Sequence, residues 1–187
     1  MSDTPVQPGA GRPLAAIGRA AGLGVVAGMR SMTAPAAVSR AAVRGRFEGL
    51  QGTPLAFVTW PPTARLLRLL ALGEYGGDKL PGIPARTNPG PLAGRAGAGA
   101  LVGAISFRDA RLPALAGALC GAGGAVLGSF AGMRARKAID DATGLPDPLV
   151  GAAEDIVAFT LAGVVLRRPV AGLAVLAGAA VALIRTR

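Results

Sequence analysis

Histidine is absent from this sequence of 187 residues, and cysteine occurs once, as Cys120. Without histidine the chain lacks the usual general base, any Ser-His-Asp triad and the commonest zinc ligand. One cysteine can form neither an internal disulfide nor a C-x-x-C metal motif. A Gly-x-x-x-x-Gly-Lys-Ser/Thr phosphate loop is missing too. We therefore expect no metal, no cofactor and no enzymatic activity, because only carboxylates are left as catalytic groups.

Charged and aromatic residues are scarce. Charged side chains make up 16% of the chain and aromatic ones 4%, whereas an average soluble domain is about 25% charged. The net charge of +10 does not indicate nucleic-acid binding, because the basic residues are scattered between apolar segments and stacking aromatics are few. Arginines that flank membrane helices and meet anionic lipid headgroups explain the charge better. We therefore expect the lipid bilayer, and no nucleic acid, as a partner.

Six apolar segments predict an all-α fold, a transmembrane bundle of about six helices. A membrane span needs roughly 20 mainly apolar residues. The segments lie at about 14–29, 63–80, 92–107, 112–133, 149–166 and 170–184. Those at 112–133 and 170–184 have no charge and no polar face, unlike the amphipathic helices of soluble proteins. The chain is too small to bury such helices in a soluble core, so we expect a multi-pass protein of the cell membrane.

The stretches between these segments predict a tail and several connectors. Residues 1–13 are rich in Gly, Pro and polar side chains, which predicts a disordered tail before a single transmembrane domain at 14–187. Residues 34–43 predict a short amphipathic or re-entrant helix behind a kink at Pro35, and 134–148 predict a polar connector. With six spans, the 20 Lys and Arg residues divide ten and ten between the two sides, so the positive-inside rule gives no orientation.

Two segments of the chain resemble each other. Residues 21–30 (AGLGVVAGMR) and 125–134 (AVLGSFAGMR) are identical at seven of ten positions. Chance similarity in a Gly/Ala-rich sequence is one explanation, but it does not account well for the shared Met-Arg ending. An internal repeat would give halves of about 14–107 and 112–185 with three spans each. Because an odd number of spans inverts the second half, we expect inverted repeats, a plan that secondary transporters use.

Acidic residues occur in two apolar segments, where a charge is costly and is usually paired inside the bundle. Glu74 and Asp78 are four residues apart and share a helix face, while Glu154 and Asp155 are adjacent. One interpretation is a pathway for an ion, a proton or a polar solute. The other is structural, with the acids of each half neutralising the arginine that ends its repeat. The candidate polar site comprises Arg30, Glu74, Asp78, Lys79, Arg134, Glu154 and Asp155.

Glycine is abundant, at 29 residues, and much of it is spaced i, i+4 inside the apolar segments. Such small-xxx-small pairs let transmembrane helices approach closely. We interpret these pairs as helix-packing faces. They are Gly18/Gly22, Gly24/Gly28, Gly99/Gly103, Gly117/Gly121, Gly124/Gly128 and Gly128/Gly132.

A second candidate site lies in the proline-rich connector at 84–91, which leads into the segment at 92–107. Arg86, Thr87 and Arg95, together with the N-terminus of that helix, form a candidate anion-binding site. The alternative is that Arg86 and Arg95 anchor the chain at lipid headgroups.

Several of these motifs follow one another along the chain: 28–35 (GMRSMTAP), 78–81 (DKLP), 84–87 (PART), 91–95 (PLAGR), 132–134 (GMR) and 154–155 (ED). In this combination they resemble the domain of unknown function family 4126, bacterial multi-pass membrane proteins, over about residues 14–166. The family often has two prolines after its Thr, where this chain has Ala34-Pro35. The resemblance implies a membrane location and brings neither an established activity nor functional residues.

Two functional hypotheses follow. The first is a small transporter or channel-like protein that passes an ion or solute through a polar site between its halves. The second is a non-transporting membrane scaffold, alone or as a homo-oligomer, whose buried charges are static ion pairs. A transporter requires a water-accessible cavity at the charged residues, whereas a scaffold requires dry, paired charges. An intramembrane enzyme is the third and weakest hypothesis.

Overall fold

The computed structural model describes residues 11–77 and 87–185, which form seven α-helices, two short 3-10 helices and no strand. The all-α prediction is confirmed. The first α-helix begins at Gly11, inside the stretch expected to be a tail, and residues 1–10 lie outside the described ranges. The elements are α1 (Gly11–Met29), α2 (Thr33–Val43), η1 (Glu48–Leu50), η2 (Pro54–Thr59), α3 (Pro61–Gly77), α4 (Pro89–Asp109), α5 (Ala114–Thr143), α6 (Asp147–Arg167) and α7 (Ala171–Arg185).

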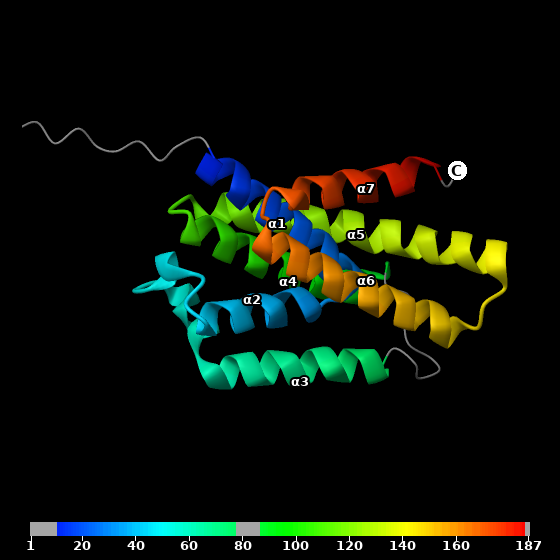
Figure 1. Ribbon diagram of the computed structural model, residues 1–187, viewed down its shortest axis with the longest axis horizontal. Coiled ribbons are helices and arrows are strands. Elements are labelled where there is room, and N and C mark those ends of the chain that lie inside the picture. The colour runs from blue at the N-terminus through cyan, green and yellow to red at the C-terminus, as the bar shows by residue number, and fades with distance from the viewer. Residues whose placement is uncertain (1–10, 78–86, 186–187) are drawn as a thin grey trace, which may run out of the picture.

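Successive α-helices run in opposite directions along the bundle (Figure 1). Contacts between glycines fix these directions. Gly99 of α4 meets Gly121 of α5, and Gly103 meets Gly117, so these two helices are antiparallel. The bundle therefore has two ends. We call the end where α1, α3, α5 and α7 begin the arginine-rich end, for the residues listed below, and the other the cluster end.

The helix α2 runs in the direction opposite to α1. Phe47, shortly after α2, lies 5.0 Å from the guanidinium carbon of Arg19 in the first half of α1, so α2 folds back along α1. The expected kink at Pro35 is wrong, because Pro35 lies in the first turn of α2, where its missing N–H leaves no helical hydrogen bond unmade. The reversal instead takes place over residues 30–32. The short helix expected at 34–43 is present as α2 and is the seventh helix, beside the six apolar segments.

This reversal overturns the predicted inversion of the repeat. The two similar segments lie on α1 and α5, where Gly24 meets Gly121 and Gly28 meets Ala125. Because the residue numbers of the contacting pairs rise together along both helices, α1 and α5 are parallel, and the two similar segments pack side by side. Four helices, and not three, precede α5, and an even number restores the original direction.

The predicted polar connector at 134–148 is mostly helical. The helix α5 continues through Arg134 and ends at Thr143, and Gly144 closes it with a left-handed backbone (φ 59°). Such a glycine is a common helix terminator because it has no side chain to clash.

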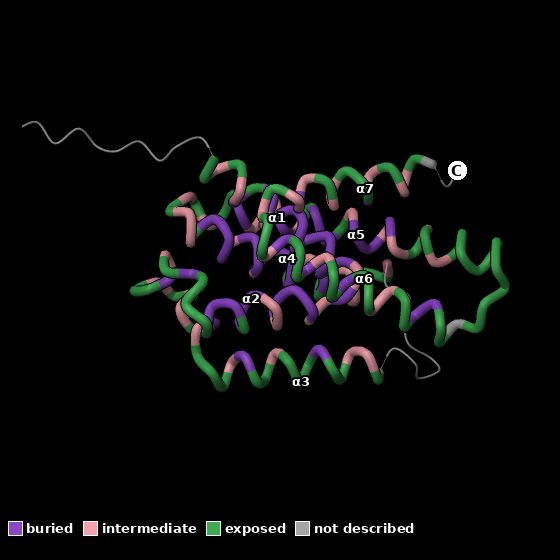
Figure 2. Tube along the Cα trace, viewed as in Figure 1, coloured by how far each residue is buried: buried purple, intermediate pink, exposed green. Residues whose placement is uncertain are grey.

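Glycine packing is confirmed at the described contacts. A Cβ added to Gly128 would overlap the carbonyl oxygen of Val25, and one added to Gly103 would overlap that of Gly117. The same overlap occurs between Gly18 of α1 and Gly172 of α7. Buried residues consequently gather around α1, which α4, α5, α6 and α7 contact closely (Figure 2).

Large apolar side chains cover much of the outside. Leu69 of α3 is 65% exposed, Leu115 of α5 is 72% exposed and Ile156 of α6 is 67% exposed. Within the described part of the chain, two helices, α5 and α6, are long and apolar enough to cross a membrane. Only 39% of the apolar stretch of α5 and 28% of that of α6 are buried inside the protein.

Charge is divided unequally between the two ends of the described chain. The arginine-rich end carries eleven arginines but only Glu48 and Asp109 as acids, whereas the cluster end carries six basic and six acidic residues. The eleven are Arg12, Arg19, Arg40, Arg44, Arg46, Arg65, Arg68, Arg108, Arg111, Arg167 and Arg168. At the cluster end the residues are Arg30, Arg95, Arg134, Arg136, Lys137, Arg185, Glu74, Asp140, Asp141, Asp147, Glu154 and Asp155.

Candidate functional site

The candidate site is built around the turn between α1 and α2. Only Arg30, Ser31 and Met32 separate the two helices. The turn therefore sits at the start of α2, where backbone N–H groups have no partner within the helix. Arg30 is 2% exposed, so this turn contains a charged side chain that is buried inside the bundle.

Glu74 of α3 caps this turn. Its Oε1 accepts hydrogen bonds from the backbone N–H of Ser31 (2.8 Å) and from the Ser31 hydroxyl (2.7 Å). Its Oε2 accepts one from the N–H of Met32 (2.9 Å). Both carboxylate oxygens are thus bound, and the negative charge lies where the dipole of α2 favours it.

Arg95 of α4 lies on the far side of Glu74. Its Nη2 is 3.9 Å from Glu74 Oε1, and both side chains are buried, with exposures of 7% and 11%. The carboxylate of Glu74 therefore joins three parts of the bundle: α3, the turn and α4. Arg95 lies inside the protein, so it does not act as a headgroup anchor.

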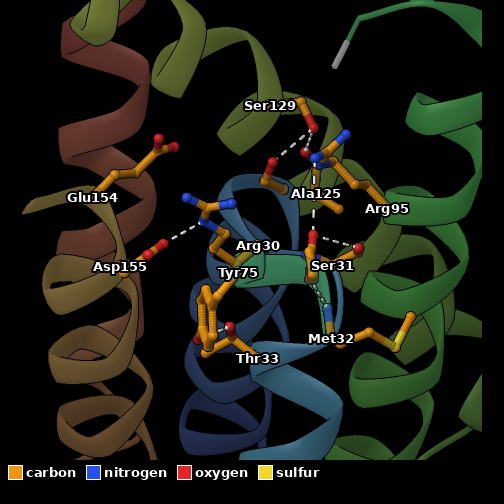
Figure 3. A network of polar contacts seen from close by, with 12 residues as sticks. Arg30, Ser31, Met32, Thr33, Tyr75, Arg95, Ala125, Ser129, Glu154 and Asp155 are labelled. Atoms are coloured by element: carbon orange, nitrogen blue, oxygen red, sulfur yellow. Dashed lines mark hydrogen bonds and ion pairs between the residues drawn. The ribbon is translucent and has the colours of Figure 1, made fainter. Parts of the chain in front are cut away.

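Arg30 joins the turn to α6. Its Nε lies 2.6 Å from Asp155 Oδ1, with side-chain exposures of 3% and 20%, and Asp155 points toward it (Figure 3). The guanidinium also lies over the ring of Tyr75, 5.5 Å from its centre. Tyr75 in turn shares a 2.7 Å hydrogen bond with the Thr33 hydroxyl and packs against the ring of Phe159.

The ion pair of Arg30 joins the two predicted halves, and Arg134 has a different partner from the one expected, so the expected pairing is wrong. Arg30 was expected to meet an acid of its own half, but Asp155 belongs to the other. Arg134 was expected to meet Glu154 or Asp155, but its guanidinium donates to the carbonyl oxygen of Leu183 in α7. Glu154 instead lies 3.7 Å from Arg136 of α5. The parallel arrangement of α1 and α5 places α6 next to both, so its acids reach both.

Ser129 ties α5 to the end of α1. Its hydroxyl donates toward the carbonyl oxygens of Gly28 (3.1 Å) and Ala125 (2.9 Å). The Gly28 carbonyl belongs to the last turn of α1, where carbonyl groups lack helical partners. Ser129 therefore supplies a partner to the end of α1, as Glu74 does to the start of α2.

Four of the predicted residues come together in this arrangement, which we call the turn cluster: residues 30–33, Glu74, Tyr75, Arg95 and Asp155. Asp78, Lys79 and Arg86 lie outside the described residues. The hydroxyl of Thr87 lies 3.7 Å from the sulfur of Met133, which is not one of the cluster residues. Sequence reasoning missed Ser31, Thr33, Tyr75, Ser129 and Arg136.

None of the four described cavities passes through the turn cluster. Of the four described, none is lined by Arg30, Glu74 or Asp155. One groove, between α2, α3 and α6, is lined by Thr33 and Tyr75 at the edge of the cluster. Two others lie at the arginine-rich end, and Asp109 of the first of them makes a 2.8 Å ion pair with Arg19.

The fold and the cluster define a class of protein: a glycine-packed, all-α bundle that buries a few paired charges and exposes many large apolar side chains. The chain belongs to the family described as domain of unknown function DUF4126, whose model matches residues 17–187. The match extends the resemblance from residue 166 through α7. Three of the sequence pieces that carry the resemblance, at 28–35, 91–95 and 154–155, supply residues of the turn cluster. No curated protein and no solved structure matches the chain.

Proposed function

We propose that this chain is a multi-pass integral membrane protein without enzymatic activity, in which the turn cluster fastens the helices together. The support begins with the distribution of side chains. Arg30 and Arg95 are 2% and 6% exposed, whereas Leu115 and Ile156 are 72% and 67% exposed. Soluble monomers rarely expose large contiguous apolar surfaces, and a core helix of a soluble protein would be mostly buried, unlike α5 and α6.

The geometry of the pairs supports a structural role for the cluster. A charge in a low-dielectric bundle is costly unless it is paired and hydrogen-bonded. The Arg30–Asp155 contact of 2.6 Å is the single observation that carries this proposal, because it joins the turn directly to α6. Together with Glu74, which binds the turn through both oxygens, it connects α1, α2, α3, α4 and α6.

The membrane location is tested by extraction. Membranes that contain the chain are washed with alkaline carbonate and, separately, with concentrated salt. We expect the chain to stay with the membranes in both washes, because apolar burial in lipid does not weaken with salt whereas surface electrostatics do. Release into the soluble fraction by either wash would contradict the proposal.

Transport is the second candidate function, and one observation favours it. The Asp155 side chain is 20% exposed, and Thr33 and Tyr75 connect the cluster to the groove. A paired carboxylate that water reaches can exchange a proton. If the chain is a transporter, proteoliposomes should dissipate a pH gradient, and Asp155→Asn should stop this flux without lowering thermal stability. The structural proposal requires the opposite: no flux, and lower stability.

A further inference from the structure

The groove between α2, α3 and α6 is apolar over much of its length. Its volume is about 710 Å³, within the range of roughly 300–1,000 Å³ that is typical of ligand pockets. The apolar part of its lining comes from all three helices and includes Ala36, Ala37, Leu72, Phe159, Ala162 and Leu166. Tyr75 and Phe159, whose rings are 5.5 Å apart, lie at the part of the groove nearest the turn cluster.

The remainder of the lining is strongly basic. Of the residues that the structure describes, no acidic one and five arginines line the groove: Arg40, Arg44, Arg46, Arg68 and Arg167. All five are exposed, and none makes an ion pair or a side-chain hydrogen bond with another residue of the described ranges. This distinguishes them from Arg19, Arg30 and Arg95, which have acidic partners.

The arginines gather toward one end of the groove, where Ala41 and Leu166 lie among them, and most of the other apolar residues lie toward the opposite end. From Ala36 to Val43, α2 rises about 10 Å at 1.5 Å per residue. Arg44 and Arg167 lie at or next to the ends of their helices, at the arginine-rich end, whereas Thr33 and Tyr75 lie toward the cluster end. The groove therefore offers an apolar surface that leads to a group of positive charges, a shape suited to an anionic amphiphile.

We propose that this groove binds an anionic phospholipid, with an acyl chain along the apolar part and the headgroup phosphate among the five arginines. The proposal rests on the proposed membrane location. Free phosphate would leave the apolar part unused, and a zwitterionic lipid would leave the positive charge uncompensated. A second copy of the chain fits poorly, because within residues 11–77 and 87–185 the arginine-rich end offers only Glu48 and Asp109 as acids, and Asp109 already pairs with Arg19.

The experiment is native mass spectrometry of the full chain in a nonionic detergent with equal amounts of phosphatidylglycerol and phosphatidylcholine. Wild type should retain phosphatidylglycerol preferentially. Arg40→Gln/Arg44→Gln/Arg68→Gln should reduce this retention by at least about tenfold, because each arginine near a phosphate contributes. The matched control, Arg65→Gln/Arg108→Gln/Arg168→Gln, removes the same charge from the same end of the bundle but outside this groove. It should change the retention of phosphatidylglycerol by less than about twofold.

A second variant tests the acyl chain separately. A Cβ added to Gly163, which lines the groove, meets no atom within 4 Å. Gly163→Phe should therefore fold, keep every charge and fill the apolar part, so that retention of phosphatidylglycerol falls. Thermal unfolding in detergent checks each variant, and Arg44→Gln/Arg167→Gln replaces the triple variant if that does not fold.

Three outcomes would overturn the proposal. An equal loss of phosphatidylglycerol retention in the groove variant and the control variant would mean that only general surface charge attracts the lipid. Full retention by Gly163→Phe would mean that no acyl chain occupies the groove. Displacement of the lipid by excess inorganic phosphate would reduce the groove to an anion site. If the chain stays in carbonate-washed membranes but does not discriminate between the lipids, only this inference fails. Release by the wash means that the proposed function itself fails.

Discussion

At the scale of single residues, buried charges hold the turn between α1 and α2 through hydrogen bonds and ion pairs. Glu74 binds two backbone N–H groups that no helical carbonyl can reach, and its own charge lies beside Arg95. Arg30 and Asp155 connect positions 125 residues apart. Each arginine is nearly inaccessible to water, so its charge depends on its acidic partner.

This dependence predicts a non-additive pair of substitutions. Asp155→Asn alone should lower the free energy of unfolding by about 3 kcal/mol, because it leaves Arg30 charged and buried. Asp155→Asn combined with Arg30→Gln should be less destabilising than the sum of the single changes. The exposed Asp141→Asn is the control and should change stability by less than about 0.5 kcal/mol. Thermal or denaturant unfolding in detergent compares wild type, Asp155→Asn, Arg30→Gln, the double variant and the control; additive losses of stability would contradict direct pairing.

Sequence reasoning could find the charged residues but not their partners. An acid inside an apolar segment is costly, so Glu74, Glu154 and Asp155 stand out in the sequence and are expected to be paired. Which arginine each meets depends on helix directions, which a local pattern does not contain. Ser31 and Thr33 carried a weak signal, because such residues favour helix starts, whereas nothing local marks Tyr75 as a partner of Thr33.

At the scale of helices, contacts between backbones decide the packing. The i, i+4 glycines of α1, α4 and α5 bring main chains into direct contact, and this contact replaces the large interlocking side chains of a soluble core. Spacing alone predicted these faces, because small residues one turn apart leave a flat strip on any helix.

Two glycines of α5 provide a matched test of these faces. Gly128→Leu places a side chain against the backbone of Val25 and should lower the free energy of unfolding by at least about 2 kcal/mol, because α1 and α5 must separate. Gly123→Leu lies on the outer side of the same helix, where an added Cβ meets no atom within 4 Å, and should be nearly neutral. Thermal unfolding of the two variants in detergent compares them. Equal stabilities would mean that α1 and α5 do not pack through Gly128.

Helix number was harder to predict than helix packing. Residues 33–43 are too short and too polar at Arg40 to be read as a span, since 11 residues reach only about 16 Å. They nevertheless reverse the chain, because Glu74 stabilises the start of α2 from 43 residues away. This one helix reverses the direction of the helices that follow, and so the two similar segments are parallel where inversion was predicted.

At the scale of the whole molecule, the corrected helix directions reveal a charge asymmetry that the six-span count concealed. Eleven arginines against two acids at one end, and six basic against six acidic residues at the other, give the described chain a strongly positive end. Lys and Arg accumulate on the cytoplasmic side of membrane proteins. The arginine-rich end should therefore face the cytoplasm, where anionic lipids of the inner surface would also supply the proposed ligand of the groove.

Thiol labelling of right-side-out spheroplasts tests the membrane-spanning bundle and its orientation together. In a Cys120→Ala background, single cysteines replace two exposed residues, Gln51 at the arginine-rich end and Ala142 at the cluster end. Labelling by a membrane-impermeant maleimide is compared before and after permeabilisation, so that each site is its own reference. We predict that Ala142→Cys is labelled fully in intact spheroplasts and Gln51→Cys only after permeabilisation. Equal labelling of the two sites in intact spheroplasts, or the reverse pattern, would contradict this account.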